Sequence, residues 1–372
     1  MLFYLGNYLN ETVEVFSFLR LVDSIIFRAL AGALTALLLT ILFGDKLILH
    51  MYKNGHRDIP RDYLDFSPSV NNAAKPVKTY GGPLLIGVIY VSIVLWCKIH
   101  TGFVVACLAS FTFFAIIGWI DDSMKVRFRN SDKGLSENKK LGLQILYCTA
   151  FGFVYISPSL TPLPIEYATM LYVPFVKYPV ANIDWFYVPF IAFTITAISN
   201  SVNIADGIDG LAVVPVAFVM GVMGVFAYIC SHYRFAEFLI FPFMPGVGEI
   251  AIICSIVFGA CLGFLWFNSY PANVIMGDTG SMALGGLLGT VSVLVKQEFL
   301  FVIVGGIFVF EAFSVIIQDK LGVKWLGRRF FSRAPIHHHF QQRGLADTKI
   351  VVRFWIVAGI LALCGLATVK IR

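Results

Sequence analysis

Long apolar runs recur along this chain from residue 21 to residue 369, and they constrain its fold more than any other feature. Most of them have the length, roughly 17–25 residues, that lets a helix cross a bilayer. Apolar residues make up 58% of the 372 and charged residues 13%, too few to give a soluble protein its polar surface. We predict one all-α integral membrane domain spanning residues 1–372, with about ten transmembrane helices at 21–43, 82–99, 102–120, 141–157, 185–200, 211–230, 249–267, 281–296, 299–318 and 351–369.

Basic residues indicate how these helices are oriented. The links 44–81, 121–140 and 319–353 contain 20 of the 28 Lys and Arg residues, and all three follow odd-numbered spans. Cytoplasmic loops are enriched in Lys and Arg, so these links are predicted to be cytoplasmic and both termini periplasmic. The polar links 201–210 and 268–280 also follow odd-numbered spans. The chemistry-bearing residues are therefore expected on the cytoplasmic face.

The link NSYPANVIMGDTGS, residues 268–281, places Asp278 between Gly277 and Thr279 and ahead of a further apolar run. A helix start offers free N–H groups to a phosphate, and a carboxylate can hold the divalent cation that accompanies it. Thr279 and Ser281 are residue types that favour helix N-caps. The alternative interpretation is that Asp278 is only an acidic cap on a membrane helix.

Two adjacent carboxylates, Asp121 and Asp122, end the third apolar run and are followed by Lys125 and Lys140. Neighbouring carboxylates repel each other, and the negative end of a helix dipole disfavours both. A bound metal ion, or a proton taken from a substrate, would explain the pair. The alternative is a solvated, charged helix end.

The stretch SNSVNIADGIDGLA contains Asn203, Asp206 and Asp209 at intervals of three residues. In a helix these side chains form one stripe, whereas Gly207 and Gly210 favour a tight turn instead. Asn and Asp also cap helices, so one of the three can serve only that purpose. Together they favour binding of a polar ligand such as a sugar, a base or hydrated magnesium.

Three consecutive histidines, His337 to His339, lie in a basic segment of the ninth link. Consecutive side chains diverge, which disfavours one shared zinc ion. We interpret the segment as a polar surface for phosphate, with one histidine able to donate a proton. A basic loop at anionic lipid headgroups would account for the arginines but not for the histidines. Glu311, inside the ninth span, is either functional or paired within the bundle.

These clusters together predict metal-assisted phosphoryl transfer. Carboxylates suit Mg²⁺, and Lys and Arg suit phosphate. The chain has no P-loop, G-x-G-x-x-G or G-x-S-x-G motif in a suitable context, which argues against an ATPase, a nicotinamide enzyme or a serine hydrolase. A transporter is the distant alternative, but nearly all the charges are predicted at one surface rather than at the bilayer midplane.

The motifs resemble those of the polyprenyl-phosphate N-acetylhexosamine-1-phosphate transferases. The triple histidine with its short basic linker points to the branch that acts on phospho-N-acetylmuramoyl-pentapeptide. The matching stretches run through most of the chain: WIDD (119–122), NSVNIADGIDGLA (200–212), FLWFNSYPANVIMGDTGS (264–281), RAPIHHHF (333–340) and VVRFWI (351–356).

This resemblance implies ten transmembrane helices in a bacterial cytoplasmic (inner) membrane, often as a homodimer, and no nucleic-acid partner. It also implies transfer of phospho-MurNAc-pentapeptide from UDP-MurNAc-pentapeptide to undecaprenyl phosphate, with Mg²⁺ required and lipid I and UMP as products. A sister enzyme that loads GlcNAc-1-phosphate is the nearest alternative.

The resemblance also implies roles for individual residues. Asp278 would be the Mg²⁺ ligand, and Asp121 the base that deprotonates the lipid phosphate, with Asp122 beside it. His338 completes the expected catalytic set. The residues expected to bind substrate are Lys75, Lys125, Lys140, Asn203, Asp206, Asp209, Asn268, Gly277, His337 and His339.

Two positions depart from the family pattern. The family usually has Lys-x-Gly-Thr-Pro-Thr-Met-Gly-Gly before the second span, where this chain has AKPVKTYGG. The equivalent lysine is therefore Lys75, with a one-residue shift, or Lys78. Ile275 stands where the family tends to have Phe, which removes an aromatic surface for the nucleotide.

Overall fold

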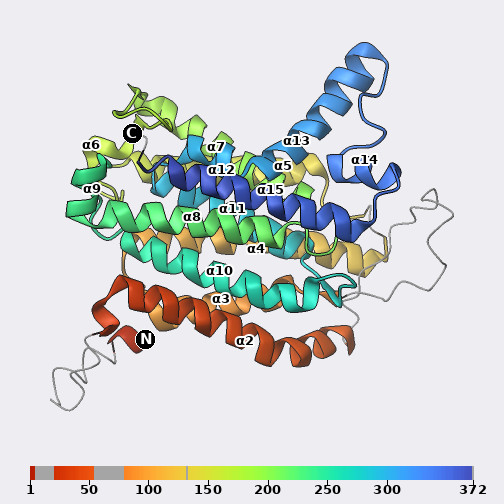
Figure 1. Ribbon diagram of the computed structural model, residues 1–372, viewed down its shortest axis with the longest axis horizontal. Helices are drawn as coiled ribbons and strands as arrows, with labels where there is room; N and C mark the ends of the chain where they lie inside the picture. The colour runs from red at the N-terminus through yellow and green to blue at the C-terminus, as the bar shows by residue number, and fades with distance from the viewer. Residues whose placement is uncertain (5–20, 54–78, 131–132, 371–372) are drawn as a thin grey trace.

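The computed structural model describes residues 1–4, 21–53, 79–130 and 133–370, and it is mostly helical (Figure 1). A helix overlaps each of the ten predicted spans. In chain order the elements are α2 (Ile25–Lys53), β1 (Thr79–Tyr80), α3 (Gly82–Trp96), α4 (Gly102–Phe128), α5 (Glu137–Ile156), α6 (Ile165–Ala168), β2 (Met170–Leu171), β3 (Ala181–Asn182), η2 (Asp184–Phe186), α7 (Tyr187–Ala205), α8 (Val213–Ser231), α9 (Tyr233–Leu239), α10 (Gly248–Asn268), β4 (Val274–Ile275), α11 (Gly277–Leu294), α12 (Glu298–Val304), α13 (Gly306–Ile316), η3 (Ile317–Trp325), α14 (Ile336–Gln342) and α15 (Asp347–Ala367).

Six helices in the described part of the chain are long and apolar enough to cross a membrane, or seven if one bent pair counts as a single span. This establishes a multi-pass membrane protein, while the number ten stays a prediction. Helix α11 is not among the six because it is less apolar. Every residue from Thr279 to Leu294 is buried. A helix that other helices shield from lipid in this way can be rich in Gly, Ser and Thr.

The stretch 299–318, predicted as one span, is not a straight helix. Helix α12 ends at Val304, and the segment formed by α13 and η3 leaves it at an angle of 86°. The break falls at Gly305 and Gly306, which favour irregular backbone because they lack side chains. Beyond the break, the end of α13 and η3 project away from the bundle (Figure 1).

Close helix packing positions the start of α11. Helix α11 packs between α4 and α7, and α10 packs between α2 and α8. Gly118 of α4 lies directly against the backbone of Asp278, and any added Cβ would clash with the carbonyl oxygen of Asp278. Small residues allow such close backbone approach inside membrane bundles. The sequence of α4 thereby places α11 so that Asp278 lies beside Asp121 and Asp122.

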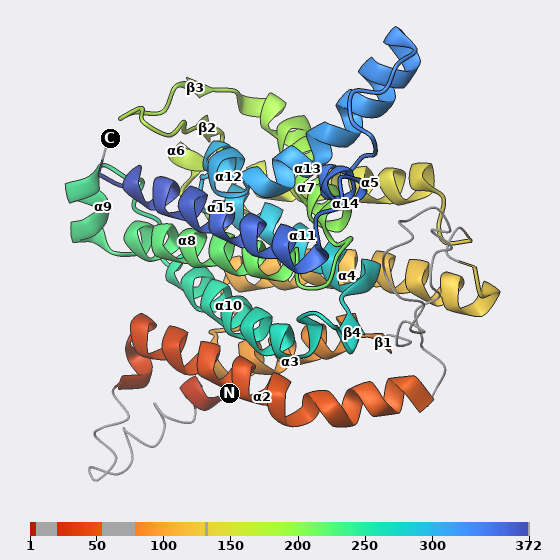
Figure 2. The ribbon, with the colours of Figure 1, turned by 45° about the vertical axis from the view of Figure 1, so that its right-hand side comes forward.

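Two short strands join the segment before α3 to the segment before α11, at the end of the bundle where Asp278 lies. Strand β1 pairs in parallel with β4, with Tyr80 opposite Ile275. The first residues of the chain and the end of α15 lie at the other end, away from β1, β4 and α14 (Figure 2). Both described ends of the chain thus lie at the end of the bundle opposite β1, β4 and α14, while the orientation of the termini in a membrane stays a prediction.

Candidate active site

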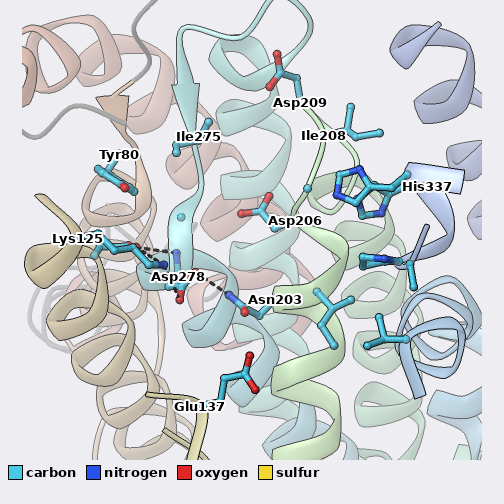
Figure 3. Close-up of a pocket in the computed structure, with 18 of the residues that line it drawn as sticks. Tyr80, Lys125, Glu137, Asn203, Asp206, Ile208, Asp209, Ile275, Asp278 and His337 are labelled. Carbon is cyan, nitrogen blue, oxygen red and sulfur yellow. Dashed lines mark hydrogen bonds and ion pairs between the residues drawn. The ribbon is translucent and has the colours of Figure 1, made fainter. Parts of the chain in front are cut away.

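A cavity of about 550 Å³ lies where α4 and α7 end and where α11 and α14 begin (Figure 3). Segments far apart in the sequence line it, so the predicted polar clusters converge on one site. The predicted site residues that line the cavity are Asp122, Lys125, Asn203, Asp206, Asp209, Gly277, Asp278, His337 and His338.

Asp278 is the centre of a cluster of charges. Its Oδ2 atom lies 2.5 Å from the Nζ of Lys140 and 3.2 Å from the Nζ of Lys125. The same two ammonium groups reach Asp121 Oδ2 at 3.0 and 2.6 Å. Asn203 donates to the other oxygen of Asp278 at 3.2 Å and to Ser281 Oγ at 2.8 Å. With Asp122 the cluster holds three carboxyl groups and two ammonium groups, a formal net charge of −1 that suits a cation.

Asp122 caps the start of α11 from the neighbouring helix. Its carboxylate accepts hydrogen bonds from the backbone N–H groups of Thr279 (2.8 Å) and Asp278 (3.3 Å) and from the hydroxyl of Thr279 (2.6 Å). The prediction that Thr279 and Ser281 are N-caps is therefore wrong, since both lie within α11. These two N–H groups also have a protein acceptor already, so they are not free for a phosphate.

Asp121 is fully buried and is not among the cavity-lining residues. Its Oδ1 atom accepts a 2.7 Å hydrogen bond from the backbone N–H of Leu135, and its Oδ2 atom faces the two lysines. Asp121 thus joins the end of α4 to the segment that leads into α5. The adjacent carboxylates of Asp121 and Asp122, which were expected to repel each other, thus have different partners in the fold.

The stretch after α7 forms a turn, not the helical stripe that was the other possibility. Helix α7 ends at Ala205, and Gly210 adopts a positive φ of 76°. Asp209 Oδ2 accepts a 3.1 Å hydrogen bond from the backbone N–H of Ala272. Asn268 is buried and does not line the cavity; it accepts from Gly210 N at 3.0 Å and donates to the backbone oxygen of Val274 at 2.8 Å. Asn268 therefore joins the two site loops.

Asp206 is partly open to the cavity, yet the surrounding protein keeps it from bulk water. This burial, together with the negative charges of Asp278, Asp122 and Asp209, raises the pKa of Asp206 to about 8. Asp206 therefore carries a proton in much of the protein at neutral pH. A cation in the cavity would favour loss of that proton.

The three histidines have three different environments. His337 is buried, and its Nδ1 atom lies 3.0 Å from an oxygen of Glu311 on α13, so Glu311 is paired within the bundle. The Nε2 atom of His337 has no hydrogen-bond partner among the described residues. His338 lines the cavity, with Nδ1 2.7 Å from Gln341 Oε1. His339 is not a lining residue; its Nδ1 accepts a 3.0 Å hydrogen bond from the backbone N–H of Ser332.

Several lining residues were not anticipated. Tyr80, Glu137 and Asp319 line the cavity together with Ile275. Tyr80 precedes a glycine pair, and the two acidic residues lie in basic links, where charge alone does not separate a site residue from a solvated one. Lys75 and Lys78 lie outside the described residues.

Comparisons with known proteins show which family the chain belongs to. Residues 104–296, a range that includes Asp121 and Asp278, match the family model of glycosyl transferase family 4. The chain is also 38% identical over 370 residues to the phospho-N-acetylmuramoyl-pentapeptide-transferase of Desulfovibrio desulfuricans, covering 98% of this chain and 99% of that protein. The chain belongs to the phospho-N-acetylmuramoyl-pentapeptide-transferase family. The resemblance seen in the motifs is thus confirmed, and the whole-length similarity includes the histidine segment beyond residue 296.

In this member of the phospho-N-acetylmuramoyl-pentapeptide-transferase family, the carboxylates provide oxygen donors of the kind that Mg²⁺ binds. One oxygen atom from each of Asp121, Asp122 and Asp278 can be chosen so that all three lie within 4.8 Å of one another. Of the three, Asp122 and Asp278 face the cavity. The donor set therefore fits a hard divalent cation, with Asp278 the least tied to backbone groups.

Proposed function

We propose that this chain transfers phospho-MurNAc-pentapeptide from UDP-MurNAc-pentapeptide to undecaprenyl phosphate, releasing UMP and forming lipid I. The single observation that carries the proposal is the cavity lined by Asp278 and Lys125 at one end of an apolar bundle, where the Asp278 carboxylate also pairs with Lys140. Lysines recognise phosphate, and carboxylates hold the cation that phosphoryl transfer uses. An acceptor held by the membrane and a donor from the aqueous side can both reach such a site.

In the reaction we favour, an oxygen of the lipid phosphate attacks the β-phosphorus of the donor, and the bond from that phosphorus to the bridging oxygen of UMP breaks. Mg²⁺ held by Asp278 would neutralise charge on the diphosphate and on the leaving UMP. Asn203 orients Asp278 by its hydrogen bond, and Asp122 holds the first turn of α11 beneath it. Lys125 and Lys140 would bind the donor phosphates.

Asp121 is our proposed base for a lipid phosphate that arrives protonated. Its two lysine contacts must loosen before it can act, and substrate phosphates would supply the competing anions. An alternative route has a carboxylate attack first and form a covalent phospho-sugar enzyme. We favour the direct route because a lipid phosphate is already anionic at neutral pH. Isolation of a phospho-muramoyl enzyme without any lipid acceptor would support the covalent route instead.

We place the nucleotide beside Asp206, Asp209 and the strand pair. Ile275 provides no aromatic face, but Tyr80 lies opposite it in the strand register and also lines the cavity. An aromatic ring is a suitable platform for a planar base. Tyr80→Leu should raise the KM for the donor several-fold, whereas Tyr80→Phe should leave it close to wild type. Equal effects of the two changes would rule out stacking.

His337 and His338 would face the donor diphosphate, with His338 as the proposed catalytic histidine. We further propose that the protein resides in the bacterial inner membrane, with the cavity on the cytoplasmic side, and that it forms a homodimer. A sister reaction with UDP-GlcNAc as donor is the alternative function, because the carboxylate and lysine chemistry is the same for both donors.

The test is UMP release by the purified chain in detergent with UDP-MurNAc-pentapeptide, polyprenyl phosphate and Mg²⁺. We expect release to require both substrates and the cation, and to fall by at least a hundredfold in Asp278→Ala. Glu237→Gln, which changes an exposed carboxylate on α9, is the matched control and should keep full activity. Release with UDP-GlcNAc alone would select the sister reaction, and an active Asp278→Ala protein would refute the assigned site.

A further inference from the structure

A second cavity, of about 400 Å³, adjoins the first beneath the projecting segment η3. Asp319 and Ala334 line both cavities, so the two share a boundary. Their chemistry differs. The first is lined by Asp122, Lys125 and Asp278 of the carboxylate and lysine cluster. The second is lined by Gln318, Asp319, Val323, Arg329, Arg333, Ala334 and Gln342.

The loop that carries the two arginines is held in place before any ligand binds. Gln318 is buried, and its side-chain amide makes three hydrogen bonds of 3.1 Å to the backbone of Phe330 and Phe331. His339 accepts the next backbone N–H, that of Ser332. Arg329 and Arg333 flank this clamped segment. Preorganised donors lose less entropy on binding a ligand.

The charge of the second cavity indicates an anionic ligand. Two guanidinium groups and one carboxylate line it, a formal excess of one positive charge. Arg329 has no ion pair within the described parts of the chain. The planar guanidinium donates paired hydrogen bonds that match a carboxylate, which is why arginine is used for such groups.

We propose that this second cavity is the subsite for the peptide part of the donor and that Arg329 and Arg333 bind its carboxylate groups. The inference rests on the proposed function. A five-residue peptide ends in a carboxylate and extends by up to about 17 Å, so it must leave the cavity that holds the diphosphate. The adjoining cavity is a route with complementary charge.

The proposal is tested by comparing two donors, UDP-MurNAc-pentapeptide and UDP-MurNAc without a peptide. Binding of each to the purified chain is measured by calorimetry, and UMP release is measured in parallel. Arg329→Gln combined with Arg333→Gln should weaken binding of the pentapeptide donor and raise its KM by roughly tenfold, since two charge-assisted contacts are lost. Binding of the peptide-free donor should change less than about twofold, because it does not reach the arginines.

Arg328→Gln is the matched control, because Arg328 lies in the same loop over the Phe330 ring but lines neither cavity. Arg329→Lys keeps the charge without the planar fork and should give an intermediate loss. The proposal would be overturned if the double variant bound both donors equally weakly or bound them as tightly as the wild type. A rise only in the KM for polyprenyl phosphate would also overturn it, because that result would indicate a lipid headgroup site. UMP release from neither donor by the wild type would instead count against the proposed function.

Discussion

At the scale of single residues, the site depends on which partner each carboxylate has. Asp121 and Asp122 are neighbours in sequence, yet Asp122 holds the backbone of α11 and Asp121 holds lysines and the backbone of Leu135. Their chemical type was apparent from the sequence. Their different structural roles were not apparent, because those roles depend on contacts with residues up to 157 positions away.

Replacing Asp122 tests its role as a cap. Asp122→Ala removes the acceptor for Thr279 and Asp278, and loss of a helix cap costs about 1 kcal/mol of stability. We expect a lower thermal midpoint in detergent and reduced activity, with Asp122→Asn intermediate because it retains one acceptor oxygen. A fully stable but inactive Asp122→Ala protein would instead point to direct contact with substrate.

Asp206 gives the protein a pH dependence whose sign can be derived. Its pKa of about 8 in the folded state exceeds the value near 3.9 of an unfolded chain, so folding favours the protonated form. The resulting stability is complete below pH 4 and is lost as pH rises through 8. Without divalent cations, Asp206→Asn should flatten the fall in thermal midpoint between pH 5 and pH 8. Parallel curves for the variant and wild type would contradict this origin.

At the scale of elements, close packing of α4 and α11 sets the distance between their carboxylates. Gly118→Ala should displace the first turn of α11, because the new methyl group would clash with the backbone of Asp278. We expect loss of most activity and a lower thermal midpoint. Gly142→Ala on α5 is the matched control, since its Cβ would meet no atom within 4 Å and Ala favours helix. Equal behaviour of the two variants would refute the packing argument.

Helices α13 and α14 meet through Glu311 and His337. If Glu311 orients this histidine, Glu311→Ala and His337→Ala should lower kcat by similar factors, and the double variant should be no worse than either one. His338→Ala is measured alongside, because His338 is the proposed catalytic histidine. Additive losses in the double variant would show that Glu311 and His337 act separately.

At the scale of the whole molecule, the membrane orientation is a prediction from the basic links. Both described chain ends lie at the end of the bundle opposite β1, β4 and α14 (Figure 2), and the basic links are predicted to be cytoplasmic. We expect a protease-cleavable tag at either terminus to be cut by protease added outside spheroplasts. Cleavage only after the membrane is permeabilised would indicate the opposite orientation.

The sequence by itself determined the membrane class, the positions of the long helices and the chemical type of the site. Apolar length and residue chemistry are local properties, so contiguous residues suffice to reveal them. The structure alone decided that Asp122 caps α11, that His337 rather than its neighbours pairs with Glu311, that Tyr80 joins the cavity, and that 299–318 breaks at Gly305. Each of these depends on how helices distant in sequence pack against one another, and no local pattern records that packing.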